Sequence, residues 1–476
     1  MKLYKMLAVL MVLAMLLAAC GATEEPPPPA EEPAAEEPAA EEPAVDADWA
    51  KQPMEETCEV VLSVESGAQE TTLGSFHDEI LEELNIDLRV VAHPFSERCE
   101  ILYLDLSSGA GQYDSMSYWP VYTADFVNWL EPLGNIAPGG DEQVAEDLGY
   151  EGVLPGYKWC YVYDDKFYSA QYDGDAKLLH YRVDLMTDEA EHAAFQEEYG
   201  YDFDIQNLTW DQYLDVARHF QRPDEEFYGT SEVAGFLAGF YLKDRIWGYG
   251  GHLFSYDDMM GLEGESATGE SNYDICVRAV QNGQDVFNTA SPPEAHSFEF
   301  EDARNQIIVH DRVAMHTMWP DGWKWANDPA LASENAVCNV AVAEMPGFDT
   351  DGDGVVDHRP NENGGRVMAI NAASKAKECA YKVLVYFQDP ERTTELVYNN
   401  DTWLDPWRVE HVDPAGAAHL CEGCEWNCEQ YTDIITKSTI DGYPALQIPG
   451  AGRYHEVLER WAKKAFANQV TAEETC

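Results

Sequence analysis

Two kinds of hydrophobic pattern alternate along the chain after residue 57. Short apolar runs typical of strands lie at 58–64, 88–92, 313–318 and 367–370, and a segment with apolar residues at helical spacing lies at 73–84. Strands that alternate with helices predict an α/β fold whose sheet is covered by helices on both faces. Sheets of this kind bind ligands beyond the carboxyl ends of their strands.

Weaker patterns extend this prediction. A helix is expected around 101–106 and a short strand at 113–116, which leads into 117–120. Thr209 and Gln212 form a capping-box pattern that predicts a helix start. Ser374 can cap a helix directly after 367–370, and apolar spacing predicts a closing amphipathic helix over 454–465.

Length and charge limit the possible functions. With 476 residues the chain exceeds what one hydrophobic core usually supports, so we expect two or more lobes. The formal charge of −59 excludes nucleic acid as a partner, because phosphate binding needs clustered Lys and Arg. The charge also favours a neutral or cationic small ligand, or simply provides a solvated surface for a salty or acidic medium.

The first 50 residues carry a targeting signal and a spacer. Lys2 and Lys5 precede an apolar run at 6–17, and the segment that ends at Cys20 resembles the lipobox of bacterial lipoproteins. The resemblance implies a signal peptide at 1–20, cleavage before Cys20 and a lipid anchor on its thiol, with a plain secretory signal as the alternative. An acidic, Pro/Glu/Ala-rich stretch at 21–50 is expected to be a semi-rigid tether.

The order of several segments over roughly residues 55–468 resembles the sugar-binding group of extracellular solute-binding proteins of ABC importers. The segments are DSMSYW, FYSAQYDGDAKLLHYRVDL, TWDQYLDVARHF, WGYGG, EDARNQIIVHDRVAMHTMWPDGW and GGRVMAINAASKAKECAYKVLVYF. Each segment alone is a common pattern, so the identification depends on their order and on their position behind a lipobox.

The resemblance implies a periplasmic-binding-protein-like type II fold, with two discontinuous α/β lobes around a ligand cleft. Lobe 1 would comprise 55–170 with 366–400, and lobe 2 would comprise 171–365 with 405–470. The chain would cross between the lobes near 170–175, 363–367 and 399–405. Gly174, Gly364 and Gly365 are permissive hinge positions within these crossings.

The implied function is that of a non-enzymatic receptor on the outer face of a bacterial membrane. It would capture a sugar or oligosaccharide by hinge closure and deliver it to the transmembrane subunits of an ABC permease, as a monomer and without a required cofactor. A surface-attached glycoside hydrolase is an alternative, although no GxSxG, HExxH or Walker motif occurs in the chain. The same receptor fold with a peptide or polyamine as its ligand is another.

A sugar-binding cleft needs aromatic rings that stack on C–H faces and polar groups that bond hydroxyls. Trp319, Asp321 and Trp323, directly after 313–318, form the best candidate unit. The remaining candidates, for which core packing, hinge geometry, a local Asx-turn or a surface ion pair is an equally good account, are Asp173, Asp175, Tyr118, Trp119, Trp247, Gly365, Trp403, Trp407 and Arg408.

An acidic loop matches the first part of an EF-hand. Its ligand positions are Asp349, Asp351, Asp353, the carbonyl of Val355, and Asp357, with a glycine at the sixth position. Pro360 replaces the twelfth-position glutamate, so Glu362 or another loop would have to complete a structural Ca²⁺ site. A bare acidic turn is the alternative.

Cysteine usage fits an exported protein. Apart from Cys20, ten cysteines remain, an even number that predicts disulfides in an oxidising compartment. Cys421, Cys424 and Cys428 could also hold zinc or form a redox pair, but they lie in an acidic loop of a chain expected to be exported, so disulfides are favoured.

Overall fold

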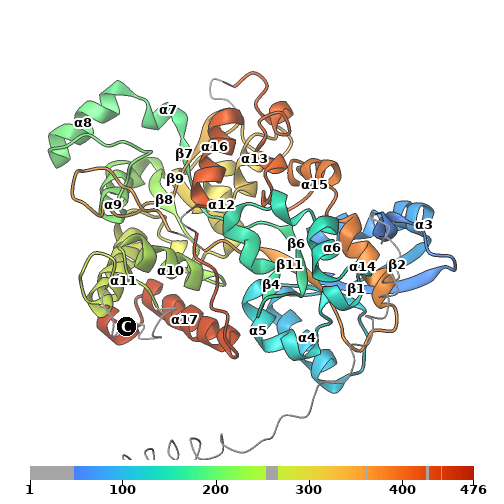
Figure 1. Ribbon diagram of the computed structural model, residues 1–476. Helices are drawn as coiled ribbons and strands as arrows, with labels where there is room; N and C mark the ends of the chain where they lie inside the picture. The colour runs from blue at the N-terminus through green and yellow to red at the C-terminus, as the bar shows by residue number, and fades with distance from the viewer. Residues whose placement is uncertain (1–47, 254–265, 361, 425–427, 441) are drawn as a thin grey trace, which may run out of the picture. The chain divides into compact units, whose positions relative to one another are not determined.

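The computed structural model of the chain describes residues 48–253, 266–360, 362–424, 428–440 and 442–476 (Figure 1). The expected signal peptide, the lipid site at Cys20 and nearly all of the tether lie outside the described residues. Within the described residues no helix is both long enough and apolar enough to cross a bilayer.

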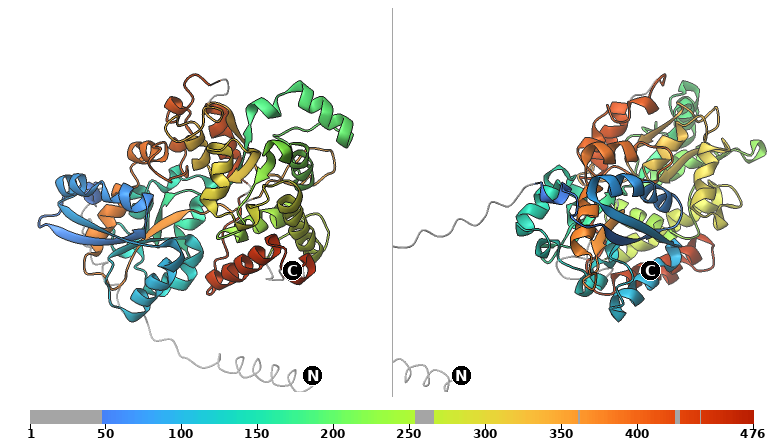
Figure 2. Two further views of the ribbon diagram at one scale, coloured as in Figure 1. Left: turned by 180° about the vertical axis from the view of Figure 1, so that it is seen from behind. Right: turned by 90° about the vertical axis from the view of Figure 1, so that its right-hand side faces the viewer.

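The first sheet contains five strands in the order β2-β1-β3-β11-β6. Its strands are β1 (Cys58–Glu65), β2 (Ile86–His93), β3 (Ser115–Tyr118), β6 (Ser169–Asp173) and β11 (Arg366–Ile370). β1 runs parallel to β2 and β3, whereas β11 is antiparallel to β3 and β6. In Figure 2 the orange strand β11 lies among blue and teal strands from much earlier in the chain. This sheet is therefore assembled from distant parts of the sequence.

The second sheet contains four strands in the order β10-β7-β9-β8. Its strands are β7 (Leu178–Arg182), β8 (Tyr228–Ser231), β9 (Val313–Met318) and β10 (Val340–Ala343). β8 and β9 are parallel, and the other two pairs are antiparallel. A small hairpin of β4 (Val162–Tyr163) and β5 (Lys166–Phe167) precedes β6. Both main sheets are therefore mixed.

Helices pack against each sheet. The helices nearest to the first sheet in the chain or in space are α2 (Ala68–Gly74), α3 (His77–Leu84), α4 (Phe95–Ser108), α5 (Thr123–Phe126), α6 (Gly140–Asp147), α14 (Lys377–Tyr386) and α15 (Pro390–Val397). The others are α7 (Val183–Met186), α8 (Glu189–Tyr199), α9 (Trp210–His219), α10 (Ala238–Gly248), α11 (Asn272–Thr289), α12 (Phe300–Ile308), α13 (Asp321–Ala326), α16 (Cys428–Ser438), α17 (Ala451–Phe466) and α18 (Ala472–Thr475).

Several expected elements are confirmed. The run 313–318 is β9, and the runs 58–64 and 367–370 are β1 and β11 with one more residue each. Both reciprocal bonds of the capping box between Thr209 and Gln212 are present at the start of α9. The closing helix over 454–465 is part of α17.

Other expectations need correction. The single helix expected at 73–84 is broken into α2 and α3, because the Ser75 hydroxyl bonds back to the Thr72 carbonyl (2.7 Å) directly after Gly74. The expected strand at 113–116 is shifted to Ser115–Tyr118. The expected helix at 101–106 is longer and begins after Pro94. Ser374 accepts a bond from the Ala376 amide, in a turn that precedes α14, so it does not cap the helix itself.

The segments that connect the two sheets pack closely together. Residues 174–177 connect β6 to β7, and the Gly174 amide donates to the Asp405 carbonyl (3.2 Å). A Cβ at Gly174 would lie 2.3 Å from the Pro406 carbonyl oxygen. Gly365 has φ +90°, and a Cβ there would lie 2.0 Å from the Asp173 carbonyl oxygen. Close backbone approach is thus a reason for glycine at both positions, whatever their part in hinge motion.

Eight of the described cysteines form four disulfides. The pairs are Cys58–Cys379, Cys276–Cys476, Cys338–Cys424 and Cys421–Cys428. The structure thus supports disulfides over zinc for the 421–428 cluster. Cys99 and Cys160, whose pairing the sequence left open, are free thiols.

A buried ion pair between Glu232 and Arg245 gives a stability prediction. Both side chains are fully buried, with Arg245 Nη2 2.7 Å from Glu232 Oε1. Replacing Glu232 with alanine leaves a buried guanidinium without its counter-charge, so we expect the free energy of unfolding to fall by about 3–5 kcal/mol. Chemical denaturation followed by circular dichroism measures the change.

The exposed pair of Lys437 and Asp433 (2.6 Å) provides the control. Solvent screens an exposed pair, so Asp433→Ala should cost less than about 1 kcal/mol. Equal losses in the two variants would contradict the prediction.

Candidate functional site

A cavity of ≈ 360 Å³ is lined by elements of both sheets. Glu65 ends β1, Trp119 follows β3, and Trp319 follows β9. The cavity thus lies at carboxyl ends of strands, where α/β sheets commonly bind ligands. Its aromatic lining residues are Phe95, Trp119, Phe236, Phe240, Phe300, Trp319 and Trp403, and its acidic lining residues are Glu65, Asp175, Glu299, Glu301, Asp302, Asp321 and Asp405.

A continuous aromatic wall forms one side of the cavity. The ring centroids of Trp119 and Phe240 lie 4.7 Å apart, and those of Phe240 and Trp319 lie 5.9 Å apart with the rings nearly perpendicular. Phe300 extends the wall, with its centroid 5.5 Å from that of Trp319. Such a wall offers apolar faces that can pack against the C–H groups of a ligand.

Arg366 organises the polar side of the cavity. Its Nη2 lies 3.3 Å from Glu65 Oε2, and its Nη1 lies 3.1 Å from Asp173 Oδ2 and 3.3 Å from Asp175 Oδ2. Asp173 Oδ1 also accepts the backbone N–H of Asp405 (2.9 Å). One guanidinium therefore joins carboxylates from β1, β6 and the segment after β6.

Two further carboxyl groups of the cavity lie close to this group, and burial raises their pKa values. Burial raises the pKa of Asp321 to about 7, although Lys324 and Arg304 act in the opposite direction. Burial, followed by repulsion from Asp321, raises the pKa of Asp405 well above its ordinary value. Both groups therefore resist ionisation when no cation faces them.

The raised pKa of Asp321 predicts how stability depends on pH. Between the ordinary value near 3.8 and about 7, the carboxyl of the unfolded chain loses its proton while the folded one keeps it. The contribution of Asp321 to the free energy of unfolding is therefore fully present below this pH window, and it is lost as the pH rises through the window. We expect the ligand-free protein to lose Tm over this window more steeply than Asp321→Asn does, in calorimetric scans at several pH values.

Asp433→Asn is the matched control, because Asp433 is exposed and does not line the cavity. Its Tm should follow that of the unchanged protein across the same pH range. Parallel curves for Asp321→Asn and the unchanged protein would show that Asp321 does not carry the effect.

The structure brings some of the sequence-predicted residues together at the cavity. These are Trp119, Asp175, Trp319, Asp321, Gly365 and Trp403. They come from five separate stretches of the chain. Their role in binding stays a prediction.

The other candidates lie in the packed interior and do not line this cavity. Trp323 is fully buried and stacks on Tyr431 with 3.8 Å between ring centroids. Trp247 stacks on Tyr443 (5.0 Å), and Trp407 packs edge-on against His411 (4.3 Å). Distant residues cover the rings of Trp323 and Trp247, whereas a residue only four positions away covers that of Trp407.

The polar candidates outside the lining have structural partners. The Tyr118 hydroxyl accepts from Thr123 (3.3 Å), and Asp173 is buried against Arg366. Arg408 donates to the Leu148 carbonyl (3.1 Å) and pairs with Glu410 (3.3 Å), as the ion-pair alternative predicted.

Sequence reasoning missed several lining residues. Glu65 directly follows the carboxyl end of a predicted strand, so the strand-end rule could have found it, whereas Arg366 lies at the amino end of the antiparallel β11, where the rule does not apply. Asp405 adjoins an expected crossing. Phe240 and Phe300 carried no signal, because each belongs to a helix whose apolar residues look like ordinary core.

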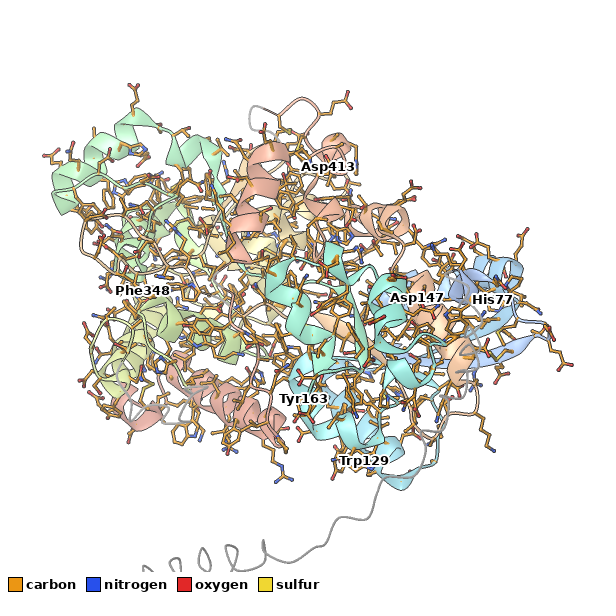
Figure 3. All side chains as sticks on the ribbon, in the orientation of Figure 1. His77, Trp129, Asp147, Tyr163, Phe348 and Asp413 are labelled. Carbon is orange, nitrogen blue, oxygen red and sulfur yellow. A yellow bond between two sulfur atoms is a disulfide. The ribbon has the colours of Figure 1, made fainter. Side chains whose placement is uncertain are left out.

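The acidic loop after Phe348, which Figure 3 labels, folds into a compact turn. The Asp349 carboxylate accepts backbone N–H groups of Gly352 (2.7 Å) and Gly354 (2.8 Å). Carboxylate oxygens of Asp349, Asp351 and Asp353 lie within 4.8 Å of one another. A calcium ion here stays a prediction.

Two of the other expected ligands are placed less favourably for a cation. Asp357 accepts from the amide (3.0 Å) and the hydroxyl of Thr350. Glu362 is buried and pairs with Lys243, so it does not supply the missing twelfth-position ligand. Val355 is exposed in the loop. Any ion would therefore be held by few protein oxygens and by water.

Calorimetric titration with Ca²⁺ after chelation tests the loop. We expect a weak binding heat that Asp351→Ala abolishes, because this change removes one of the three clustered carboxylates. Asp413→Ala, at an acidic residue labelled elsewhere in Figure 3, should leave the heat unchanged. A titration without heat would contradict the calcium prediction.

Comparison with known proteins gives a family match. The model of the family described as bacterial extracellular solute-binding proteins matches residues 67–393. Among curated protein sequences, none matches the chain.

Many solved structures share the fold. An ABC transporter solute-binding protein from Agrobacterium radiobacter K84 in complex with ribitol has a TM-score of 0.69 and 17% identity, over 89% of this chain and 97% of its own. Maltose-bound MalE3 of T. maritima has a TM-score of 0.67 and 19% identity, over 88% and 97%. A Listeria monocytogenes ABC substrate-binding protein in complex with cycloalternan has a TM-score of 0.64 and 13% identity, over 88% and 96%.

At these identities the likeness concerns the fold alone. It confirms the predicted α/β fold of type II periplasmic binding proteins, here with two mixed sheets. The lobe boundaries proposed from the sequence stay a prediction.

Proposed function

The chain belongs to the bacterial extracellular solute-binding protein family, and on that premise we propose that it captures a carbohydrate for an ABC importer. Members of this family are non-enzymatic transport receptors, so the glycoside hydrolase alternative is dropped. The single observation that carries the proposal is the aromatic wall that faces carboxylates at the strand ends.

Sugar chemistry suits this arrangement. Pyranose rings present C–H faces to Trp119, Phe240 and Trp319, while their hydroxyls donate to carboxylate oxygens of Asp175 and Asp321. Structures of similar fold are described with ribitol, maltose and cycloalternan, and all three are polyhydroxylated. These likenesses support a carbohydrate, without indicating which one.

Capture would proceed by closure of the two lobes around the ligand. Phe95, at the start of α4 beside the first sheet, contacts Phe236, just before α10, with 5.1 Å between ring centroids. Both rings line the cavity, so this contact is suited to cover a bound ligand. Affinity would then depend on contacts made only in the closed state.

The remaining parts of the proposal concern location and partners. We expect the closed receptor to deliver its ligand to the transmembrane subunits of a permease. A lipid on Cys20 would hold a monomeric receptor at the outer face of the membrane, with the acidic tether as its spacer. Both features fall on residues that the structure does not describe.

Truncation of Trp319 tests the site. Trp319→Ala removes the centre of the aromatic wall, so the dissociation constant for a bound sugar should rise by about tenfold or more, which corresponds to about 1.4 kcal/mol. Calorimetric titration with sugars that raise the Tm of the unchanged protein measures this.

Trp129→Ala is the control, since Trp129, labelled in Figure 3, packs on Tyr103 and does not line the cavity. It should leave the sugar affinity as it is. Unchanged affinity in Trp319→Ala would mean that the ligand binds elsewhere, and binding of peptides but of no sugar would overturn the proposed function.

A further inference from the structure

The inner end of the cavity carries more negative than positive charge. Five carboxyl groups gather there, those of Glu65, Asp173, Asp175, Asp321 and Asp405. Among the described residues, Arg366 forms ion pairs with three of these carboxylates. They are Glu65, Asp173 and Asp175, so Asp321 and Asp405 are not among its partners. Carboxylate oxygens of Asp173, Asp175 and Asp405 lie within 4.8 Å of one another.

Two of these carboxyl groups have an oxygen without a hydrogen-bond partner among the described residues. They are Oδ1 of Asp321 and Oδ1 of Asp405. The two residues are only 5% and 1% exposed, and both line the cavity. Buried polar atoms nearly always have partners, so these two oxygens indicate that something else bonds them.

Lys324 lies close by but does not satisfy these oxygens. Its ammonium group donates to the carbonyls of Val397 (3.0 Å) and Leu404 (2.9 Å) and to the Thr402 hydroxyl (3.1 Å). An ammonium has three donors, and these three bonds use all of them. Both oxygens belong to residues that line the cavity, so a ligand bound there can reach them.

The chemistry of that partner follows from the charge. A sugar hydroxyl can donate one hydrogen bond but supplies no positive charge, so the two buried carboxyl groups, whose pKa values burial raises, stay protonated beside it. A protonated amine supplies both donors and a positive charge. The aromatic wall already faces two cations, since the Lys243 ammonium lies 4.4 Å from the Phe240 ring centroid and the Lys177 ammonium lies 5.0 Å from that of Trp319. The carboxyl groups, and not the rings, would therefore select an amine.

We propose that the ligand is an amino sugar whose protonated amine contacts Asp321 and Asp405 while its ring packs on the Trp119–Phe240–Trp319 wall. This inference rests on the proposed carbohydrate function and narrows its substrate class. It also gives the acidic inner end a part in selectivity, because a neutral sugar of the same shape leaves two carboxyl groups without a counter-charge.

Matched pairs of sugars test the inference with the full-length protein. The pairs are glucose with glucosamine, galactose with galactosamine, and cellotriose with the corresponding glucosamine trimer, with spermidine added as a cation without a sugar ring. Dissociation constants are measured by calorimetric titration at neutral pH and low ionic strength. In the pair that binds, we expect the amine to bind about tenfold tighter or better.

Each outcome separates the inference from the proposed function. Equal or tighter binding of the neutral member overturns the amino-sugar inference and leaves the carbohydrate function standing. Binding of spermidine without binding of any sugar overturns both, and so does the absence of binding by every member of every pair.

Asp405→Asn tests the position of the amine. The preference for the amine should fall by about tenfold, while the affinity for the neutral member stays the same. The Tm of the ligand-free variant should not fall, because a neutral amide of the same shape replaces a buried carboxyl group whose pKa is raised; if it does, the preference for the amine is measured in Asp321→Asn instead. Asp401→Asn, at an exposed residue on the same segment that does not line the cavity, should keep the preference. A preference that survives in both Asp405→Asn and Asp321→Asn would overturn the inference.

Discussion

The guanidinium of Arg366 is the contact on which the arrangement of the strand ends depends. It joins Glu65 at the end of β1 to Asp173 at the end of β6 and to Asp175 just beyond. Asp173 in turn accepts the N–H of Asp405, from the segment that passes beside Gly174. Removing this one cation would leave three mostly buried carboxylates facing one another, and the cavity floor would lose its order.

The class of fold and the end of the sheet that holds the cavity could be predicted, because the hydrophobic period and the alternation of strands with helices are visible locally along the sequence. The sequence could not separate a cavity tryptophan from a core tryptophan. Trp319 and Trp323 are four residues apart in one motif, yet Trp323 is covered by Tyr431, which lies more than a hundred residues later. Which ring stays accessible depends on such distant partners, and a single sequence does not reveal them. Phe240 was missed for the same reason, since every residue of α10 is buried.

Charged side chains buried inside the fold show how the net charge of −59 is divided between the interior and the surface. Many of the 29 Lys and Arg side chains are not at the surface but serve buried pairs or carbonyls. Those less than a tenth exposed are Arg98, Lys177, Arg182, Lys243, Arg245, Lys324, Lys382 and Arg408. Carboxyl residues are buried to the same degree, namely Glu65, Asp105, Asp173, Glu232, Asp244, Asp321, Glu362, Asp405 and Glu459. The surface therefore stays as acidic as the composition indicates, and anionic solutes are repelled before they reach the cavity.

The position of β11 in the first sheet affects when this sheet can form during synthesis of the chain. β3 and β6 are both made early, but the strand that joins them is made about two hundred residues after β6. The disulfide between Cys58 and Cys379 spans a sequence separation of 321 residues and closes the same gap. A chain made from its N-terminus cannot complete the first sheet until β11 has been synthesised. Until then, the edges of β3 and β6 that pair with β11 have no partner strand. The first sheet and the disulfide that spans it can therefore form only after residue 379 has been made.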